Sequence, residues 1–503
     1  MPGGSEVTWL VWAQGPLVLC TLALTWGALR TAARTAGVDL KTVIGVVAVV
    51  LLALLIYPPG ALFGEWSGHQ SRYQALLHGD VLADGTFAST VTFPVPAGIA
   101  WTLGALLPER AAELVWLFGN RLALGIAAFG VAATAGLLAA DDRRTHARRL
   151  ALALLLLSPT AVVWSATGFA VTPALAAGSL GLVLAAAGRP FAALAWAALA
   201  TGVRPEGLAL LVGLPVLGLA FTDRGALRKD LPLLPLGLGV AAVQWLALSA
   251  KRHGLPIGHR LELYWDNLEL IPLGGPLFQW PVLALAIAVV VVARPPALRP
   301  VRLVAWGLAL VACAGQLPAI MDTGARHFLP PTLLLVPCVA AALAQAIPPS
   351  PPVHRALAAC CALLLLGLGF GGHLDWAHRY RADEPLYPRW VRLADAGESG
   401  SFEEVLDPDC FVYLPDGERS WPGARDVFDV GNVQMARWEM QGIVDGGGTA
   451  CVQWASRPWV RFTGDAQLEY LDRAVRVLGL VPVGWIEDPP DDSGRWILFE
   501  GRL

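Results

Sequence analysis

Long apolar segments recur through the first three quarters of the chain, separated by short polar stretches that are rich in arginine. A helix needs about 20 mainly apolar residues to cross a hydrocarbon core of about 30 Å. The pattern therefore predicts a mostly α, polytopic transmembrane helical bundle of about 11–13 spans. The expected spans are 8–28, 41–58, 113–140, 150–168, 170–187, 190–203, 205–221, 231–250, 278–293, 302–320, 328–347 and 356–372.

The apolar pattern stops at residue 372, and a polar tail of about 130 residues follows. "CVQWA" and "RWILFEG" have the β-branched and aromatic content of strands. "DAQLEYLDRAVRVLGL" has apolar positions at helical spacing. We therefore expect two domains: a transmembrane domain over 1–372 and a small α/β domain over 373–503. The tail tryptophans, Trp454 among them, are expected in its core more often than on a sugar.

The arginine-rich connections predict the orientation. "DDRRTHARR", "DRGALRK" and "ARPPALRPVR" fall on one side when every expected span is counted, and that side should be cytoplasmic. Three connections then lie outside, namely 59–112, 251–277 and 321–327, together with the tail. Lys251, Arg252 and Arg260 are exceptions on the outer side. The N-terminal segment lacks the basic start of a signal peptide, so we expect a retained first span.

The composition agrees with a membrane protein. The chain is 55% hydrophobic and 15% charged, whereas soluble domains carry about 25% charged residues. The net charge of −3 gives no reason to expect a nucleic-acid partner. Of the seven cysteines, Cys410 and Cys451 fall in the tail. These two cysteines could form a disulfide if the tail is extracytoplasmic.

The first outer loop, 59–112, is too polar for a span and long for a connector. "SRYQALLHG" and "AGIAWTLGALL" have helical periodicity, which favours a partly ordered loop. A carboxylate here can serve as general base towards a hydroxyl, and neighbouring cations can hold a phosphate. The alternative is a loop whose charges only face water. The candidates are Glu65, Asp80 and Asp84 as bases, with His69 and Arg72 as binding residues.

"ATGVRPEGLALL", residues 200–211, places charges within an apolar stretch. A charge at the centre of a spanning helix costs about 2.5–3.5 kcal/mol, so it usually faces a cavity or a partner. Pro205 disfavours helical backbone at Arg204 and suits the first position of a new helix. We therefore expect one helix to end near Val203 and another to begin at Pro205. The two form a hairpin whose tip lies near the outer face.

At this tip, Arg204 and the free N–H groups of the new helix are suited to bind a phosphate. Glu206 can orient Arg204 or a substrate hydroxyl. The alternative is an Arg204–Glu206 pair that only fixes the hairpin. "DTGARHFLPP" offers a second pair of cations at the same level, Arg326 and His327, whose alternative role is interfacial snorkelling.

Taken together, the acidic outer loop, the "ATGVRPEGLALL" stretch and "ARHFLPPTLLLVP" resemble the GT-C superfamily of polytopic glycosyltransferases. The likeness is to the bacterial group around protein O-mannosyltransferases and aminoarabinose transferases, and it covers residues 41–372. The tail loosely resembles the small periplasmic α/β domain of some members. The resemblance implies a multi-pass protein of the bacterial inner membrane with its tail in the periplasm.

The resemblance also implies an activity. Such enzymes transfer a sugar from a polyprenyl-phosphate carrier to an acceptor on the outer side, which here would be an unknown glycan, lipid or protein. Glu65 best matches the family's catalytic acid, and Asp80 or Asp84 are substitutes. Arg204 and Arg326 match positions that contact the carrier phosphate or have structural roles. The usual Asp–Glu pair is absent, since Gly64 precedes Glu65.

Two other functions remain open at this stage. A transporter or lipid flippase would explain the spans and the broken helix, although such proteins commonly show two related halves, and no repeat is visible. A non-catalytic envelope assembly protein would use the tail to bind a partner. The histidines show no metal-ligand spacing, so a divalent metal would have to be held by the loop carboxylates.

Overall fold

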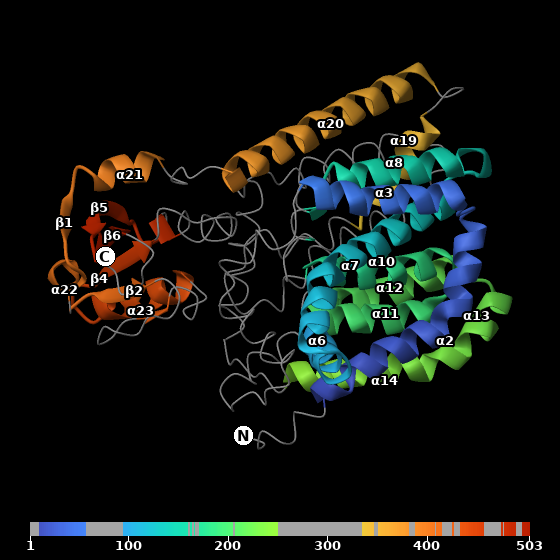
Figure 1. Cartoon of the computed structure of the whole chain (residues 1–503), viewed down its shortest axis with the longest axis horizontal. Coiled ribbons are helices and arrows are strands. Elements are labelled where there is room, and N and C mark those ends of the chain that lie inside the picture. Colours follow the sequence, from blue (N-terminus) through green and yellow to red (C-terminus); the bar gives the residue numbers. More distant parts are fainter. Residues whose placement is uncertain are drawn as a thin grey trace. The chain divides into compact units, whose positions relative to one another are not determined.

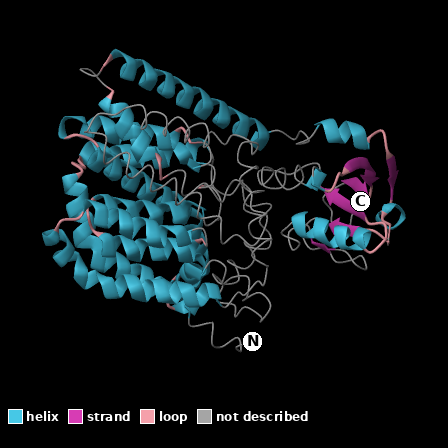
Figure 2. Cartoon of the chain, turned by 180° about the vertical axis from the view of Figure 1, so that it is seen from behind, coloured by secondary structure: helices cyan, strands magenta, loops and turns pink. Residues whose placement is uncertain are grey.

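A computed structural model describes residues 10–56, 94–158, 161–162, 165, 171–204, 207–249, 334–346, 351–381, 388–407, 409–414, 425–426, 433–456, 474–475, 477–488 and 495–502. These residues form two compact units. The described residues up to Asp375 belong to the first, and those from Trp376 onward belong to the second. The first is helical and the second contains a sheet (Figure 1; Figure 2).

The first unit consists of apolar helices joined by short turns. Its helices are α2 (Gln14–Thr35), α3 (Leu40–Ile56), α6 (Pro94–Leu106), α7 (Glu109–Leu138), η1 (Asp141–Arg143), α8 (Arg144–Leu156), α10 (Val171–Ala186), α11 (Pro190–Val203), α12 (Leu208–Phe221), α13 (Arg224–Asp230), η3 (Leu231–Leu233), α14 (Leu234–Ser249) and α19 (Val336–Gln345). The long helix α20 (Pro352–Arg381) begins in this unit and ends in the second.

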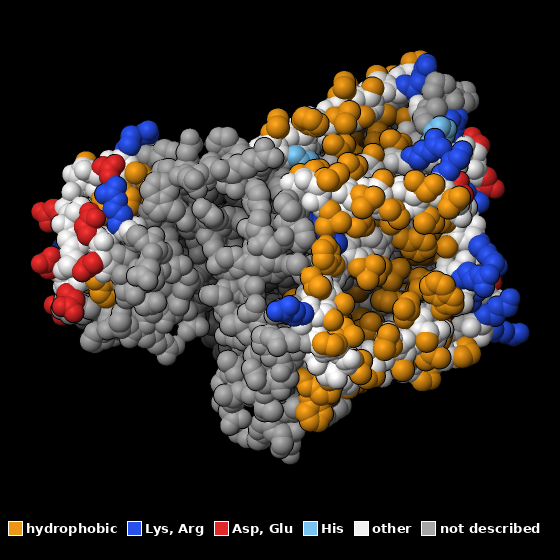
Figure 3. Space-filling model, in the orientation of Figure 1, with side chains coloured by type: hydrophobic (Ala, Val, Ile, Leu, Met, Phe, Trp, Pro, Cys, Tyr) orange, Lys and Arg blue, Asp and Glu red, His pale blue; other side chains and the backbone are white. Residues whose placement is uncertain are grey.

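Helix α11 lies at the centre of the helical unit. It packs against α10, α12 and α14, and most of its residues are buried alanines or other small side chains. Small residues allow helix backbones to approach closely. Large apolar side chains lie on the outer surface instead, for example Leu51 and Leu55 of α3, Val212 of α12 and Trp245 of α14. Figure 3 shows this apolar surface.

Three helical stretches in the described ranges are long and apolar enough to cross a membrane: Leu10–Thr35, Arg110–Leu138 and Arg224–Ala247. Others are shorter. The 14 residues of α11 rise about 21 Å, less than a hydrocarbon core of about 30 Å. The expected 11–13 spans are therefore not confirmed. The expected spans 278–293 and 302–320 lie outside the described residues.

Two elements differ in their limits from the sequence interpretation. Helix α8 covers Arg144–Leu156, whereas the expected span was 150–168. Its polar first turn follows η1, whose Asp141 pairs with Arg144 at 2.7 Å. Helix α6 lies within the predicted outer loop, over Pro94–Leu106, and so confirms the helical periodicity of "AGIAWTLGALL". The part of that loop up to residue 93 lies outside the described residues.

The second unit contains a mixed sheet in the order β1-β5-β6-β4-β2-β3. Strands β4 and β6 are antiparallel, as are β5 and β6, whereas β1 pairs with β5, and β2 with β4 and β3, in parallel. "CVQWA" and "RWILFEG" form β4 and β6 as predicted. The strands are β1 (Glu398–Gly400), β2 (Phe411–Leu414), β3 (Arg425–Asp426), β4 (Cys451–Ser456), β5 (Val481–Ile486) and β6 (Trp496–Arg502).

Hydrophobic clusters cover both faces of the sheet. On one face, Trp454 and Phe499 pack with residues of α21 (Pro388–Ala394) and α23 (Val433–Asp445). On the other face, Trp496 packs at 6.4 Å between ring centroids against Phe402 of α22 (Phe402–Val405). The second unit is thus a small α/β domain, as the sequence predicted. The predicted helix over 465–480 lies largely outside the described residues.

Candidate functional site

The break in "ATGVRPEGLALL" leaves a buried arginine at the end of a helix. Helix α11 ends at Val203, as predicted, and Arg204 follows it with extended backbone (φ −149°, ψ 135°). The Arg204 side chain is 1% exposed. The Gly207 amide donates to the Arg204 carbonyl oxygen at 2.9 Å, and this turn delays the start of α12 to Leu208. The sequence had placed that start at Pro205.

The predicted hairpin is confirmed. Gly218 of α12 lies against Pro190 at the start of α11, and Gly207 lies against Ala200 near its end, so the two helices are antiparallel. A Cβ atom on Gly207 would lie 2.6 Å from the carbonyl carbon of Ala200 and the amide nitrogen of Thr201. Such a contact is with backbone that cannot move aside. Glycine is therefore required at the tip, whose approach to the outer face stays a prediction.

A buried pair of amides lies beside the tip. A Cβ atom on Gly202 would collide with the side chain of Gln244 in α14. The Gln244 Nε2 group donates to Oε1 of Gln14 at 2.7 Å, and the Gln14 Nε2 group donates to the Leu10 carbonyl oxygen at 2.9 Å. Oε1 of Gln244 is buried and accepts no hydrogen bond within the described part of the chain. The end of α11 thus packs against a buried acceptor.

A second buried arginine, Arg121, lies in α7. It is 2% exposed. Its guanidinium donates to Oγ of Ser165 at 2.6 Å and to the Val162 carbonyl oxygen at 3.3 Å. Its neighbour Asn120 is also buried. Arginine carries five donors in a rigid fork, so it can hold these oxygens and still present donors elsewhere.

The helix packing places Arg121 and Arg204 at the same end of the helical unit. Helices α7 and α10 run in parallel, with Gly130 against Ser179. Arg121 lies nine residues before Gly130 in α7, and nine residues before Ser179 is the position that directly precedes α10. Arg121 is therefore level with the start of α10. Because α10 and α11 are antiparallel neighbours, that start is level with Arg204. The buried hydroxyl of Thr172 lies at the same level.

The opposite end of α11 holds a buried carboxylate. Oδ2 of Asp230 accepts hydrogen bonds from the Phe191 and Ala192 amides, at 2.6 and 3.3 Å. These amides are unsatisfied donors of the first helical turn, so Asp230 caps α11. Across the described ranges Asp230 is the only fully buried acidic side chain. This buried carboxylate therefore lies at the opposite end of the helical unit from Arg204 and Arg121.

Arg204 is the predicted site residue that the structure describes. It is buried, as expected for a residue that faces a partner rather than lipid. The others lie outside the described residues, so whether they converge on Arg204 stays a prediction. They are the three candidate bases Glu65, Asp80 and Asp84 and the candidate binding residues His69, Arg72, Glu206, Arg326 and His327.

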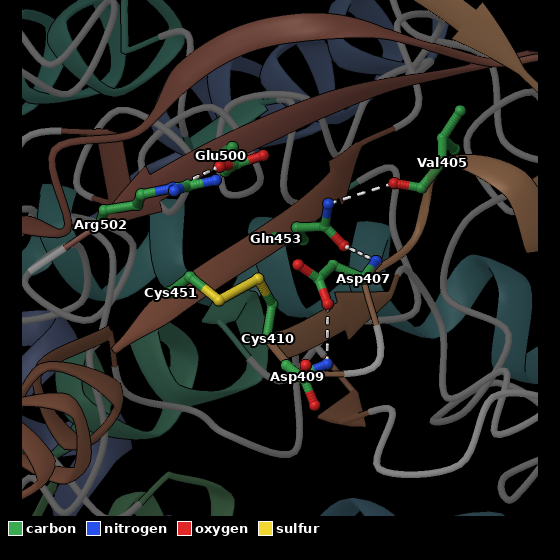
Figure 4. The surroundings of a disulfide bond; sticks show 8 residues. All are labelled: Val405, Asp407, Asp409, Cys410, Cys451, Gln453, Glu500 and Arg502. Carbon is green, nitrogen blue, oxygen red and sulfur yellow. Dashed lines mark hydrogen bonds and ion pairs between the residues drawn. A yellow bond between two sulfur atoms is a disulfide. The ribbon is translucent and has the colours of Figure 1, made fainter. Parts of the chain in front are cut away.

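The tail holds a disulfide next to a carboxylate. Cys410 directly precedes β2, Cys451 begins the neighbouring strand β4, and their sulfur atoms are bonded (Figure 4). Asp407 is the third member of a group whose ligand atoms lie within 4.8 Å of one another. Metal ions bind thiolates, and neither sulfur is a thiolate while the bond exists. The oxidised group is therefore unsuited to hold a metal.

Several of these buried polar residues did not stand out in the sequence. Arg121 was detectable, because it is a charge inside an apolar helix of 30 residues. Gln14 and Gln244 were not, since single uncharged polar residues are common in apolar helices. Arg148 belongs to "DDRRTHARR", which indicated only a cytoplasmic connection. It is nevertheless buried, at 3% exposure.

No protein-family model, no curated protein and no solved structure matches the chain. The resemblance to the GT-C superfamily therefore depends on short motifs of the sequence. The activity that those motifs imply is a proposal.

Proposed function

We propose that the chain is a membrane glycosyltransferase that moves a sugar from a polyprenyl-phosphate carrier to an acceptor hydroxyl on the extracytoplasmic side. The observation that carries the proposal is the buried Arg204 at a break between two packed apolar helices. Charged residues within apolar helical units are rare and usually mark functional sites. A phosphate is well matched to a guanidinium, which binds it through two parallel hydrogen bonds.

The reaction needs a base and a stabilised leaving group. Glu65, the first candidate for the base, takes the proton of the acceptor hydroxyl. The acceptor oxygen then bonds to the anomeric carbon, while the bond from this carbon to the carrier phosphate breaks. The electron pair leaves with the phosphate, whose charge is stabilised by Arg204 and Arg326.

The buried polar groups around the tip support a sugar substrate. Oε1 of Gln244 can accept a hydrogen bond from a hydroxyl, and it lies beside Gly202, two residues before Arg204. Ligand sites usually combine apolar walls with a few such polar groups. A sugar phosphate requires a hydrogen-bond acceptor for a sugar hydroxyl and, next to it, an arginine for the phosphate.

Two further observations support the location. The large apolar side chains on the outside of the helical unit are typical of a surface that contacts lipid. The Cys410–Cys451 bond supports an extracytoplasmic tail, because such bonds persist in oxidising compartments.

Binding of undecaprenyl phosphate to the purified full-length protein tests the role of Arg204. Removal of charge-assisted hydrogen bonds in Arg204→Gln should weaken binding about tenfold to hundredfold. Arg204→Lys keeps the charge but loses the planar fork, so its affinity should be intermediate. Arg224→Gln, at an exposed position of α13, is the control. A folded Arg204→Gln protein that binds the carrier like the wild type would exclude the phosphate-binding role.

Transfer of a lipid-linked sugar in proteoliposomes tests the chemistry. Glu65→Gln, Asp80→Asn and Asp84→Asn are measured one at a time, and one of them should lose transfer about a hundredfold or more. If all three keep full transfer, the proposed acid–base role is wrong. Movement of the carrier across the bilayer without sugar transfer would instead support a flippase.

A further inference from the structure

A basic pocket lies at the other end of the helical unit, between α3 and α8. Its volume is about 180 Å³, and its walls include Lys41, Arg148, Arg149, Gly45 and Leu152. Figure 3 shows Lys and Arg side chains gathered at this end of the unit, near α13 and the start of α8. The pocket belongs to the end that the arginine distribution predicts to be cytoplasmic, away from Arg204.

Arg148 is fixed in the wall of this pocket. Its guanidinium donates to the Ala36 carbonyl oxygen at 2.8 Å and to Oγ1 of Thr42 at 3.1 Å, and it pairs with Asp39 at 3.7 Å. Asp39 is itself engaged, because Thr42 donates to it through both its amide and its hydroxyl. This network fixes the side chains at the polar end of the pocket, and it engages Asp39, the one carboxylate that lines the pocket.

The other two cations of the pocket are available. Lys41 and Arg149 are exposed, and neither forms an ion pair with any described residue. Three cations and one carboxylate line the pocket, so it carries a net charge of two positive units. A group with one or two negative charges is therefore the complementary ligand.

The rest of the pocket is apolar. Leu152 approaches Gly45 so closely that a Cβ atom there would lie 2.7 Å from its Cδ1 atom. Beyond the pocket, Ile44, Val47 and Leu51 continue along α3 with more than half of each side chain exposed. A polar end with cations that leads onto an exposed apolar helix face matches a lipid, with a charged headgroup and acyl chains, better than a free ion.

We propose that this pocket binds the phosphate headgroup of an anionic phospholipid of the cytoplasmic leaflet. Lys41 and Arg149 hold the phosphate from its exposed side, and Arg148 supports it from below. The acyl chains lie along the outer face of α3. The site is distinct from the Arg204 tip and does not depend on the transfer chemistry, so either one can fail without the other.

Native mass spectrometry of the delipidated full-length protein tests the proposal with added phosphatidylglycerol or phosphatidylcholine. Each cation near an anionic headgroup contributes about fivefold in affinity, so Lys41→Gln/Arg149→Gln should weaken phosphatidylglycerol binding about 25-fold. Arg224→Gln/Lys229→Gln removes two exposed cations of α13 and should bind like the wild type. Lys41→Arg/Arg149→Lys keeps the charges and should also retain the lipid.

Four results would overturn the proposal. If Lys41→Gln/Arg149→Gln and Arg224→Gln/Lys229→Gln lose phosphatidylglycerol binding equally, the lipid is attracted to any basic surface and not to this pocket. Equal retention of phosphatidylcholine would show that the headgroup charge is not recognised. Displacement of the lipid by glycerol 3-phosphate at the same concentration would show a site for free phosphates. Loss of binding in the charge-keeping variant would exclude charge as the determinant, even if the glutamine variant fails to fold.

Discussion

Gln244 donates a hydrogen bond to Gln14 across 230 residues of sequence, at 2.7 Å and with both side chains fully buried. The bond joins α14 to α2 directly beside the tip of the α11–α12 hairpin. The bond thus holds α2 and α14 together beside Gly202, two residues before Arg204. A ligand of Arg204 would lie close to this bond.

Replacement of either glutamine by leucine should destabilise the protein by about 1–2 kcal/mol, because the remaining amide is left buried without its partner. The double variant should cost less than the sum of the two by about 0.6 kcal/mol or more. Thermal unfolding in detergent measures this cycle. Thr31→Val, on the exposed side of α2, is the control and should change little. Strict additivity would show that the two side chains do not interact.

Gly207→Ala should destabilise the hairpin by about 1–3 kcal/mol, since its Cβ atom would meet the backbone of Ala200 and Thr201. Gly239→Ala in α14 is the matched control, because nothing lies within 4 Å of its Cβ position. The control should be neutral or stabilising, as alanine favours helix. Equal melting temperatures for the two variants would contradict the close approach at the tip.

Replacement of Cys410 and Cys451 by serine should lower the free energy of unfolding of the tail by about 4 kcal/mol, on the chain-entropy estimate for a separation of 41 residues. In intact cells, the two thiols should react with a maleimide only after reduction. Cys20, a free cysteine inside the candidate span Leu10–Thr35, should stay unlabelled with and without reduction and serves as the internal control. Labelling of Cys410 before reduction would place the tail in a reducing compartment.

Asp39→Asn should reduce stability at neutral pH and have little effect in acid. Hydrogen bonds from Thr42, together with the charge of Arg148, hold the pKa of Asp39 below its ordinary value of 3.8. A carboxyl with a lowered folded-state pKa stabilises the protein above 3.8 and loses that contribution as pH falls through the folded-state value. Melting temperatures between pH 7 and pH 3 measure the difference. Asp142→Asn, at a carboxylate that is 70% exposed, is the matched control.

Local signals predicted the hairpin and two strands correctly. The sequence "RPEG" specifies its own break, since proline, glycine and a charge act over a few residues. Strands β4 and β6 were recognisable by their aromatic and β-branched residues. The core position of Trp454 is also confirmed, because it is 3% exposed and its ring lies 5.2 Å from that of Tyr413.

Features that depend on distant parts of the chain were not predictable. The Gln14–Gln244 bond and the burial of Arg148 require a known packing of α2 with α14 and of α3 with α8. Strand β2 has only four residues, too few to show a clear alternation, and the strand order follows from crossovers that no local pattern encodes. Helix lengths were overestimated for α8 because apolar residues continue beyond the end of the helix.

The Cys410–Cys451 bond turns residues 410–451 into a closed covalent ring. A protease that cuts once inside this ring opens the chain without releasing a fragment, because the sulfur bridge still joins the two pieces. A nicked protein would migrate as one species until a reductant separates it. Any processing of the chain within this segment would therefore leave the cut pieces together, and strand β6, which pairs with β4, would stay covalently connected to the helical unit.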